Sequence, residues 1–280
     1  MQSNLLWTVA KPPYVLQLAG TETGPPRLER IIQTGKEQAE PHFSRAKLIP
    51  EELQAAQVLS SKVEREMLIE LSQAGFVREQ DVLGSKAKDE IRTALENLLK
   101  AGLLNVEHLL ECKRTGTRLT RLRDLQQLQD TNVGTLICPS CGSNFSQELP
   151  SKGYSLSDLG RKMSRQSYWM TVWVTDMLTK LGVPQDAILW NVSESGEEVD
   201  LLMDQLWIFE LKDREFGSGD AYPLNYRQVR YRVNKAIIVT TERVSRDAKR
   251  VLSRPAEKFL KTPVEKFRFW PMKSPHPQML

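Results

Sequence analysis

Residues 197–213 read EEVDLLMDQLWIFELKD, two apolar, strand-like runs with charged residues at their outer ends. Side chains alternate between the two faces of a strand, so Glu210 and Lys212 share one face. Asp204-Gln205 favours a two-residue turn between the runs. Such a turn places Asp200 across the hairpin from Glu210. The stretch therefore predicts a β-hairpin that carries two carboxylates and a lysine on one patch.

The patch of Asp200, Glu210 and Lys212 has the composition of a divalent-cation site. Neighbouring carboxylates repel each other, and a cation between them relieves this repulsion. Hard carboxylate oxygens suit Mg²⁺ or Mn²⁺, which polarise a phosphoryl oxygen and activate water. The lysine can position that water and offset negative charge on a phosphate. A salt-bridge ladder on an exposed sheet is the alternative, and the apolar residues of both runs disfavour it.

The neighbouring residues predict the elements around the hairpin. An apolar helix is expected over residues 164–182, followed by a strand at 188–194. After the hairpin, residues 222–233 favour a helix, 235–241 a buried strand and 245–253 a last helix. The predicted order is helix, three strands, helix, strand and helix.

This order and the spacing Asp200-x9-Glu210-Leu211-Lys212 resemble the PD-(D/E)xK motif and core of the restriction-endonuclease-like nucleases. The resemblance covers about residues 161–253, and Val199 stands where the motif has proline. It implies that Asp200 and Glu210 are metal ligands and Lys212 is the catalytic lysine. The backbone carbonyl of Leu211 and the carboxylate of Glu198 are implied as further metal ligands. A relative of these nucleases that has lost activity is the alternative.

The stretch that follows the motif also suits a nucleic acid. Residues 217–220, GSGD, suggest a flexible lip at the site. Aromatic rings alternate with arginines beyond it, an arrangement that can stack on bases and bind phosphates. The candidate contacts are Tyr226, Arg227 and Arg230. Alternatively, the tyrosines pack in the protein and the arginines face water.

Residues 60–122 resemble a winged helix-turn-helix, with a helix, a short helix, a longer helix and a basic hairpin. In that family the third helix often enters the DNA major groove and the wing contacts phosphate. The acidic residues of the third helix disfavour the first role here. The basic residues that could bind phosphate at the hairpin are Lys113, Arg114, Arg118 and Arg121. A solvated basic face or a protein-binding surface is the alternative.

Cys138-Pro-Ser-Cys141-Gly resembles a zinc knuckle, in which backbone amides point at the sulfurs. Cys112 is the upstream partner, but Thr115 stands where its companion cysteine is expected. His108 is the nearby histidine that could complete the ligand set. Two interpretations stay open, a structural Zn²⁺ held by three cysteines and a histidine, and a degenerate ribbon that folds without metal.

Composition is ordinary for a protein of two or three domains. The 280 residues carry a net charge of +4, and 40% are hydrophobic. No apolar run approaches the roughly 20 residues needed to cross a bilayer. The N-terminus lacks a signal-peptide pattern, and three cysteines argue against a disulfide framework. We expect a cytoplasmic protein with no membrane partner.

The expected fold is α/β, built from several α+β domains with a mixed sheet flanked by helices at the C-terminus. The predicted parts are an N-terminal extension of unknown role (1–58), a winged-helix-like domain (59–125), a zinc-ribbon-like knuckle and linker (126–160) and a nuclease domain (161–280).

The expected function is metal-dependent endonuclease activity on DNA in preference to RNA, in prokaryotic antiviral defence or DNA repair. The alternatives are a non-catalytic winged-helix DNA-binding protein and a nuclease effector that a partner or ligand activates. A homodimer, or a partner protein bound through residues 1–58, is also expected.

Overall fold

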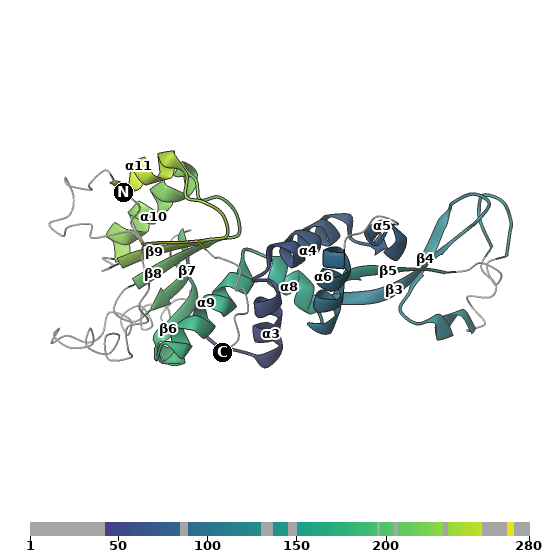
Figure 1. The fold of residues 1–280 in the computed structure, drawn as a ribbon, viewed down its shortest axis with the longest axis horizontal. Helices are drawn as coiled ribbons and strands as arrows, with labels where there is room; N and C mark the ends of the chain where they lie inside the picture. Colours follow the sequence, from purple (N-terminus) through teal and green to yellow (C-terminus); the bar gives the residue numbers. More distant parts are fainter. Residues whose placement is uncertain are drawn as a thin grey trace. The chain divides into compact units, whose positions relative to one another are not determined.

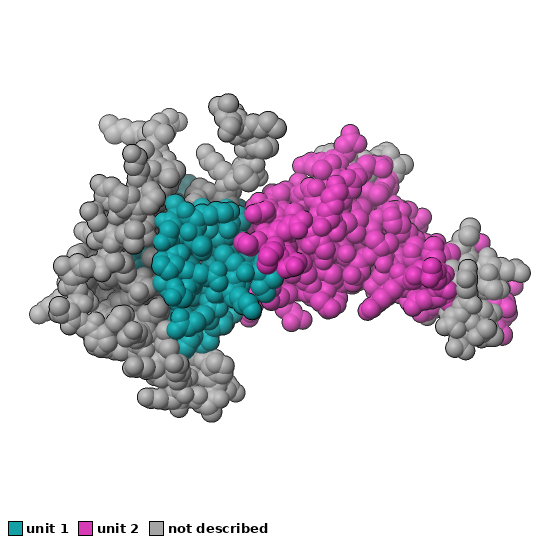
Figure 2. All heavy atoms as spheres, turned by 90° about the horizontal axis from the view of Figure 1, so that it is seen from below, with its two compact units in different colours: residues 1–49, 170–273 teal, residues 50–169, 274–280 magenta. Residues whose placement is uncertain are grey.

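The computed structural model describes residues 43–84, 89–129, 137–144, 150–194, 197–203, 207–231, 235–253 and 268–271. The chain has a mixed α/β fold and divides into two compact units, coloured separately in Figure 2. Unit 1 comprises residues 1–49 and 170–273, and unit 2 comprises residues 50–169 and 274–280. Most of the predicted N-terminal extension, residues 1–42, lies outside the described residues.

The described part of unit 1 contains one mixed sheet with the strand order β1-β6-β7-β8-β9-β10. Strands β6, β7 and β8 form an antiparallel meander, β9 and β10 continue it in parallel, and β1 pairs antiparallel with β6. The strands are β1 (Ser44–Arg45), β6 (Ile188–Glu194), β7 (Glu197–Met203), β8 (Trp207–Lys212), β9 (Lys235–Thr240) and β10 (Arg268–Pro271). The sheet edge therefore includes residues from the predicted N-terminal extension.

The pairing of β7 with β8 sets the position of the charged residues. Leu201 lies opposite Phe209 and Met203 opposite Trp207, so the same register places Asp200 opposite Glu210. This agrees with the geometry expected from the hairpin pattern. The predicted turn, Asp204-Gln205, lies outside the described residues.

Helices cover both faces of the unit 1 sheet (Figure 1). On one face lies α9 (Tyr168–Lys180), where the Thr175 hydroxyl accepts a 2.8 Å hydrogen bond from the Trp190 indole of β6. The 3-10 turn η3 (Gln185–Ala187) follows it. On the other face lie α10 (Ser218–Tyr231) and α11 (Arg246–Ser253). The predicted order of helices and strands is confirmed.

The hydrophobic core under α10 and α11 shows which face of the sheet carries the charged residues of β8. It is made of small, aliphatic and aromatic side chains from the sheet and both helices: Leu189, Val192, Ile208, Phe216, Ala221, Leu224, Ala236, Ile238, Val244, Ala248 and Leu252. Ile208 belongs to this core, and side chains two residues apart share a face. Glu210 and Lys212 therefore point to the α10 side of the sheet.

Unit 2 combines helices with a second sheet. The helices are α3 (Pro50–Val58), α4 (Lys62–Ala74), α5 (Glu79–Val82), α6 (Asp89–Lys100) and α8 (Asp158–Ser164). Helix α4 ends at Gly75, which has a φ of 72° that suits glycine and donates its N–H to Leu71. Glu52 is almost fully buried, where it pairs with Lys162 and accepts a hydrogen bond from the Tyr168 hydroxyl.

The unit 2 sheet has the order β2-β5-β3-β4 and is antiparallel throughout. Its strands are β2 (Val77–Arg78), β3 (Leu104–Glu111), β4 (Arg118–Leu122) and β5 (Ser151–Leu156), and the 3-10 helix η1 (Leu125–Gln129) follows β4. The β3–β4 pair is the hairpin that the sequence predicted. Figure 1 shows these strands extending beyond α4 and α6 toward the hairpin loops.

Strand β5 lies within the residues expected to form a knuckle and linker, and its sequence, SKGYSL, contains glycine and lysine, which disfavour strands. It nevertheless pairs with β3 from Leu104–Leu156 to Leu109–Ser151. Gly153 is required here, since a Cβ at this position would lie 2.3 Å from the Phe76 ring. The residues predicted as a linker therefore include a central strand of this sheet.

Candidate active site

Asp200, Glu210 and Lys212 converge on the α10 side of the unit 1 sheet. The Lys212 ammonium lies 2.8 Å from Glu210 Oε1 and 4.0 Å from Asp200 Oδ2. The Glu210 side chain is only 5% exposed, whereas Asp200 and Lys212 are each about one fifth exposed. The three residues of the sequence motif thus form one cluster. Solvent can reach it at Asp200 and Lys212, whereas Glu210 is buried.

Asp200 is held in a position that disfavours its negative charge. Its Oδ2 accepts a 2.7 Å hydrogen bond from the Leu211 N–H. Burial, together with the charge of Glu210, nevertheless raises the pKa of Asp200 to about 7. A carboxyl that titrates near neutrality beside a second carboxylate is suited to gain a cation. The donor set therefore fits a hard divalent ion such as Mg²⁺ or Mn²⁺.

Lys212 remains a cation in this cluster. Burial lowers the pKa of its ammonium, but the negative charges of Glu210 and Asp200 outweigh burial and raise the pKa overall. A lysine that stays protonated acts as a charge and a hydrogen-bond donor. It can therefore orient a phosphate oxygen or a water molecule, and it is not arranged as a neutral base.

Arg227 of α10 completes the cluster. Its Nη1 donates a 2.6 Å hydrogen bond to Glu210 Oε2, and its side chain is 13% exposed. The sequence analysis placed Arg227 among the nucleic-acid contacts and missed this ion pair. The helical spacing contained a signal, because Arg227 follows buried Leu224 by three residues on the inner face of α10.

The neighbouring tyrosine takes the opposite position. Tyr226 is 50% exposed, so the structure separates it from Arg227 and leaves it on the surface of α10. The side chains of Arg230 and Glu198, two further candidates, lie outside the described side chains. Leu211 contacts Asp200 through its N–H, and its carbonyl as a metal ligand stays a prediction.

Strand β6 is distorted next to the cluster. By the β6–β7 register Asn191 stands opposite Asp200, but the ladder passes from Trp190–Leu201 to Val192–Val199 without this pair. Asn191 has a φ of 52°, a left-handed conformation that asparagine tolerates better than most residues. Backbone irregularities of this kind cluster at functional sites. An asparagine between the apolar residues Trp190 and Val192 was the sequence signal for it.

The start of α10, where the sequence suggested a flexible lip, is hydrogen-bonded to the end of β8. The guanidinium of Arg214 makes two 2.8 Å hydrogen bonds to the Asp220 carboxylate, and Gly217 donates its N–H to the same group at 3.0 Å. Burial raises the pKa of Asp220, but these hydrogen bonds outweigh burial and lower it overall. Asp220 therefore joins the end of β8 to the first turn of the helix that carries Arg227.

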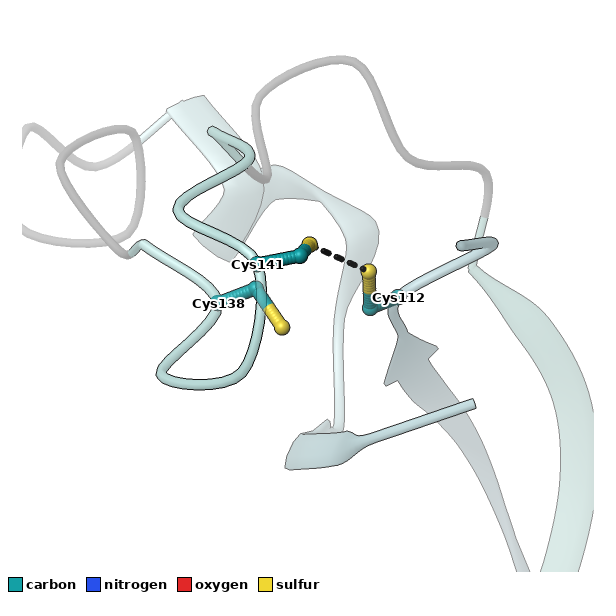
Figure 3. Close-up of side chains that lie close together, drawn as sticks. All are labelled: Cys112, Cys138 and Cys141. Atoms are coloured by element: carbon teal, nitrogen blue, oxygen red, sulfur yellow. Dashed lines mark hydrogen bonds between the residues drawn. The ribbon is translucent and has the colours of Figure 1, made fainter. Parts of the chain in front are cut away.

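A second cluster lies in unit 2, where Cys112, Cys138 and Cys141 come together (Figure 3). Their sulfur atoms all lie within 4.8 Å of one another, and those of Cys112 and Cys141 are 3.5 Å apart. Three thiols so placed could bind a metal ion such as zinc. Within the described residues, His108 does not join this group.

Thr115 lies beside the thiols in place of the expected histidine. Its hydroxyl is 3.3 Å from the Cys138 sulfur. Hydrogen bonding by Thr115 lowers the pKa of Cys138 to about 6 and also lowers the pKa of Cys112. Thiolates are the form in which cysteine binds metals. Cys112 and Cys138 therefore lose their protons to a cation more readily than an ordinary cysteine does.

The basic residues of the β3–β4 hairpin differ in their surroundings. Arg118 pairs with Glu111 at 3.4 Å, and Arg121 lies 3.7 Å from Glu107 and over the Phe76 ring. Lys113 and Arg114 are exposed in the turn between the strands. Arg114 also donates a 3.3 Å hydrogen bond to the Ser143 hydroxyl, so this turn is joined to the loop that carries Cys138 and Cys141.

Comparisons with protein-family models, with curated proteins and with solved structures find no match for this chain. Within the described residues, no helix combines the length and the apolar character that a membrane-spanning helix needs.

Proposed function

We propose that unit 1 is a divalent-metal-dependent nuclease of the PD-(D/E)xK type, which hydrolyses phosphodiester bonds in DNA. One observation carries this proposal: two carboxylates and a charged lysine meet on the sheet, and Asp200 titrates near neutrality. The helix, meander, helix and strand order around them supports it. Asp200 and Glu210 would hold Mg²⁺ or Mn²⁺, which supplies Lewis acidity toward the phosphate when bound.

The four charged side chains of the cluster have separate roles in the proposed reaction. Asp200 and Glu210 supply carboxylate oxygens from neighbouring strands. Lys212 orients the attacking water and stabilises the negative charge that grows on the phosphate. Arg227 holds Glu210 on its second oxygen, so it keeps this carboxylate in one orientation.

Unit 2 is proposed to position the nucleic acid. Its short helix, third helix and hairpin follow the order expected of a winged helix. The turn residues Lys113 and Arg114 are the proposed phosphate contacts. A structural zinc ion at the three cysteines is proposed to brace this hairpin.

The test is a cleavage assay on the purified full chain. End-labelled single- and double-stranded DNA and RNA are incubated in Mg²⁺, Mn²⁺ or EDTA. Asp200→Asn, Glu210→Gln and Lys212→Met each retain side-chain size while changing charge. Exposed Asp247→Asn and Lys180→Met serve as matched controls.

Metal-dependent cutting that the controls keep and the site variants lose by more than about 100-fold would support the nuclease. No cutting of any substrate in either metal, with binding that survives EDTA, would favour the non-catalytic DNA-binding alternative.

A nuclease effector is the second candidate, because both Glu210 oxygens already bind cationic side chains. A metal ion has to compete with Arg227 for this carboxylate. If the wild-type chain is silent but Arg227→Ala or an added partner permits Mn²⁺-dependent cutting, the effector interpretation is favoured.

A further inference from the structure

The two loops of the cysteine cluster are built alike. The first reads Cys112-Lys-Arg-Thr115-Gly116 and the second Cys138-Pro-Ser-Cys141-Gly142. In each, the glycine N–H donates to the carbonyl of the first cysteine, at 2.7 Å and 2.8 Å. The φ angles of Gly116 and Gly142 are 66° and 71°, a region that suits glycine.

The backbone hydrogen bonds that close the loops match as well. The N–H of Cys112 donates to the Thr117 carbonyl at 3.0 Å, and that of Cys138 to the Ser143 carbonyl at 2.8 Å. The two loops therefore share one backbone arrangement, residue for residue. In this correspondence Thr115 occupies the position in its loop that Cys141 occupies in the other.

The sulfur spacing fits a tetrahedral ion better than a disulfide. With zinc–sulfur bonds of about 2.3 Å, thiolates around one ion lie roughly 3.8 Å apart. The 3.5 Å separation of Cys112 and Cys141 is close to this value. A disulfide would use two of the cysteines and leave the third without a sulfur partner. Cys112 and Cys138 are both almost fully buried. Two hydroxyls approach the thiols: that of Thr115 lies 3.3 Å from the Cys138 sulfur, and that of Ser143 lies 3.1 Å from the Cys141 sulfur. The Ser143 hydroxyl also accepts a hydrogen bond from Arg114, and only Thr115 stands at the loop position that corresponds to a cysteine ligand.

His108 is badly placed for the fourth position. It lies in β3, opposite Leu122 of β4, four residues before Cys112. Four residues of extended chain cover about 13 Å. The imidazole is accordingly not among the groups that gather around the sulfurs in the described part of the chain.

We propose that Cys112, Cys138 and Cys141 bind one zinc ion through three thiolates, and that an oxygen at Thr115 fills the fourth position. This oxygen is the hydroxyl itself or a water that the hydroxyl holds. The site is a two-knuckle zinc site in which one thiolate has been replaced by a weaker, neutral ligand. Its metal is consequently held less tightly and exchanges faster than in a four-thiolate site.

The first experiment measures metal on the reduced full-length chain. Elemental analysis, or titration with Zn²⁺ alone, is expected to reach one zinc per chain. X-ray absorption at the zinc edge is expected to show three sulfurs and one lighter ligand. Co²⁺ in place of zinc is expected to give tetrahedral d–d bands with thiolate charge transfer.

Variants then identify the fourth ligand. Thr115→Cys is expected to raise zinc affinity against a competing chelator by about tenfold or more and to shift the Co²⁺ spectrum to that of four thiolates. His108→Ala is expected to leave affinity and spectrum unchanged. Loss of metal in His108→Ala with an unchanged fold by circular dichroism would overturn the oxygen ligand. Failure of the reduced wild-type chain to bind Zn²⁺, with its thiols open to a thiol reagent, would overturn the metal site. These readouts do not involve nuclease activity, so their outcome does not depend on whether unit 1 cuts a nucleic acid.

Discussion

The Arg227 guanidinium donates a 2.6 Å hydrogen bond to the Glu210 carboxylate, although the two residues lie on a helix and a strand 17 positions apart. Lys212 binds the other oxygen of the same carboxylate at 2.8 Å. A nearly buried carboxylate is thus compensated by two cations, and an uncompensated charge there would be costly.

Removing Arg227 should destabilise the metal-free protein. In EDTA, Arg227→Ala is expected to lower the free energy of unfolding by about 2–4 kcal/mol, because Glu210 loses one of two partners. Mn²⁺ should recover part of this loss, since a cation can replace the guanidinium. The measurement is urea unfolding with and without Mn²⁺. Exposed Arg250→Ala is the control, and an equal loss with and without Mn²⁺ would argue against a cation at Glu210.

Metal affinity should depend on pH through Asp200. Since the pKa of Asp200 is about 7, a cation has to displace a proton below this pH. Mn²⁺ binding measured by calorimetry is expected to be about tenfold weaker at pH 6 than at pH 8. A pH-independent affinity would contradict the assignment of Asp200 as a ligand.

The carboxyl of Asp200 should also make the stability of the metal-free protein depend on pH. The folded pKa of about 7 exceeds the ordinary value of 3.8, so the folded state holds the extra proton between these limits. The contribution of Asp200 to stability is therefore present at low pH and decreases as pH rises toward 7. In EDTA at pH 8, Asp200→Asn is expected to stabilise unit 1 by roughly 1–3 kcal/mol, an advantage that shrinks toward pH 5. Thermal unfolding at both pH values measures it, and a variant less stable than wild type at pH 8 would refute it.

Gly153 should be intolerant of a side chain. A Cβ there meets the Phe76 ring at 2.3 Å and the Val77 carbonyl oxygen at 2.5 Å. Gly153→Ala is expected to destabilise unit 2 by about 2–4 kcal/mol, because β2 and β5 have to separate. Gly84→Ala is the matched control, since its nearest atom lies at 3.5 Å. Equal melting temperatures of the two variants would show that β5 does not pack as described.

The hairpin turn should contribute to DNA affinity in a salt-dependent way. Lys113→Ala with Arg114→Ala is expected to weaken binding uniformly across sequences. The salt slope should fall by about 1 for each phosphate that the turn no longer neutralises. Fluorescence anisotropy at several salt concentrations measures this. Lys62→Ala, at an exposed position of α4, serves as a control, and an unchanged slope in the double variant would remove the turn from the interface.

The local pattern of the sequence was sufficient for the hairpin and its charged patch. Side-chain alternation and strand length follow from residues close in the chain, so Asp200, Glu210 and Lys212 could be placed together without a structure. The knuckle around Cys138 and Cys141 could also be predicted from the sequence, because the short spacing of the cysteines and the glycine after them specify the turn.

The tertiary structure decided the features that join distant segments. Arg227 reaches Glu210 because α10 packs on one face of the sheet, and this packing depends on the core as a whole. Strand β5 forms from residues of low strand propensity because β2 and β3 supply its partners and Gly153 fits against Phe76. Thr115, and not His108, meets the cysteines because a strand holds the histidine at a distance while a turn brings the threonine in. In each case the position of a residue depends on contacts with residues far away in the sequence, which local sequence patterns do not encode.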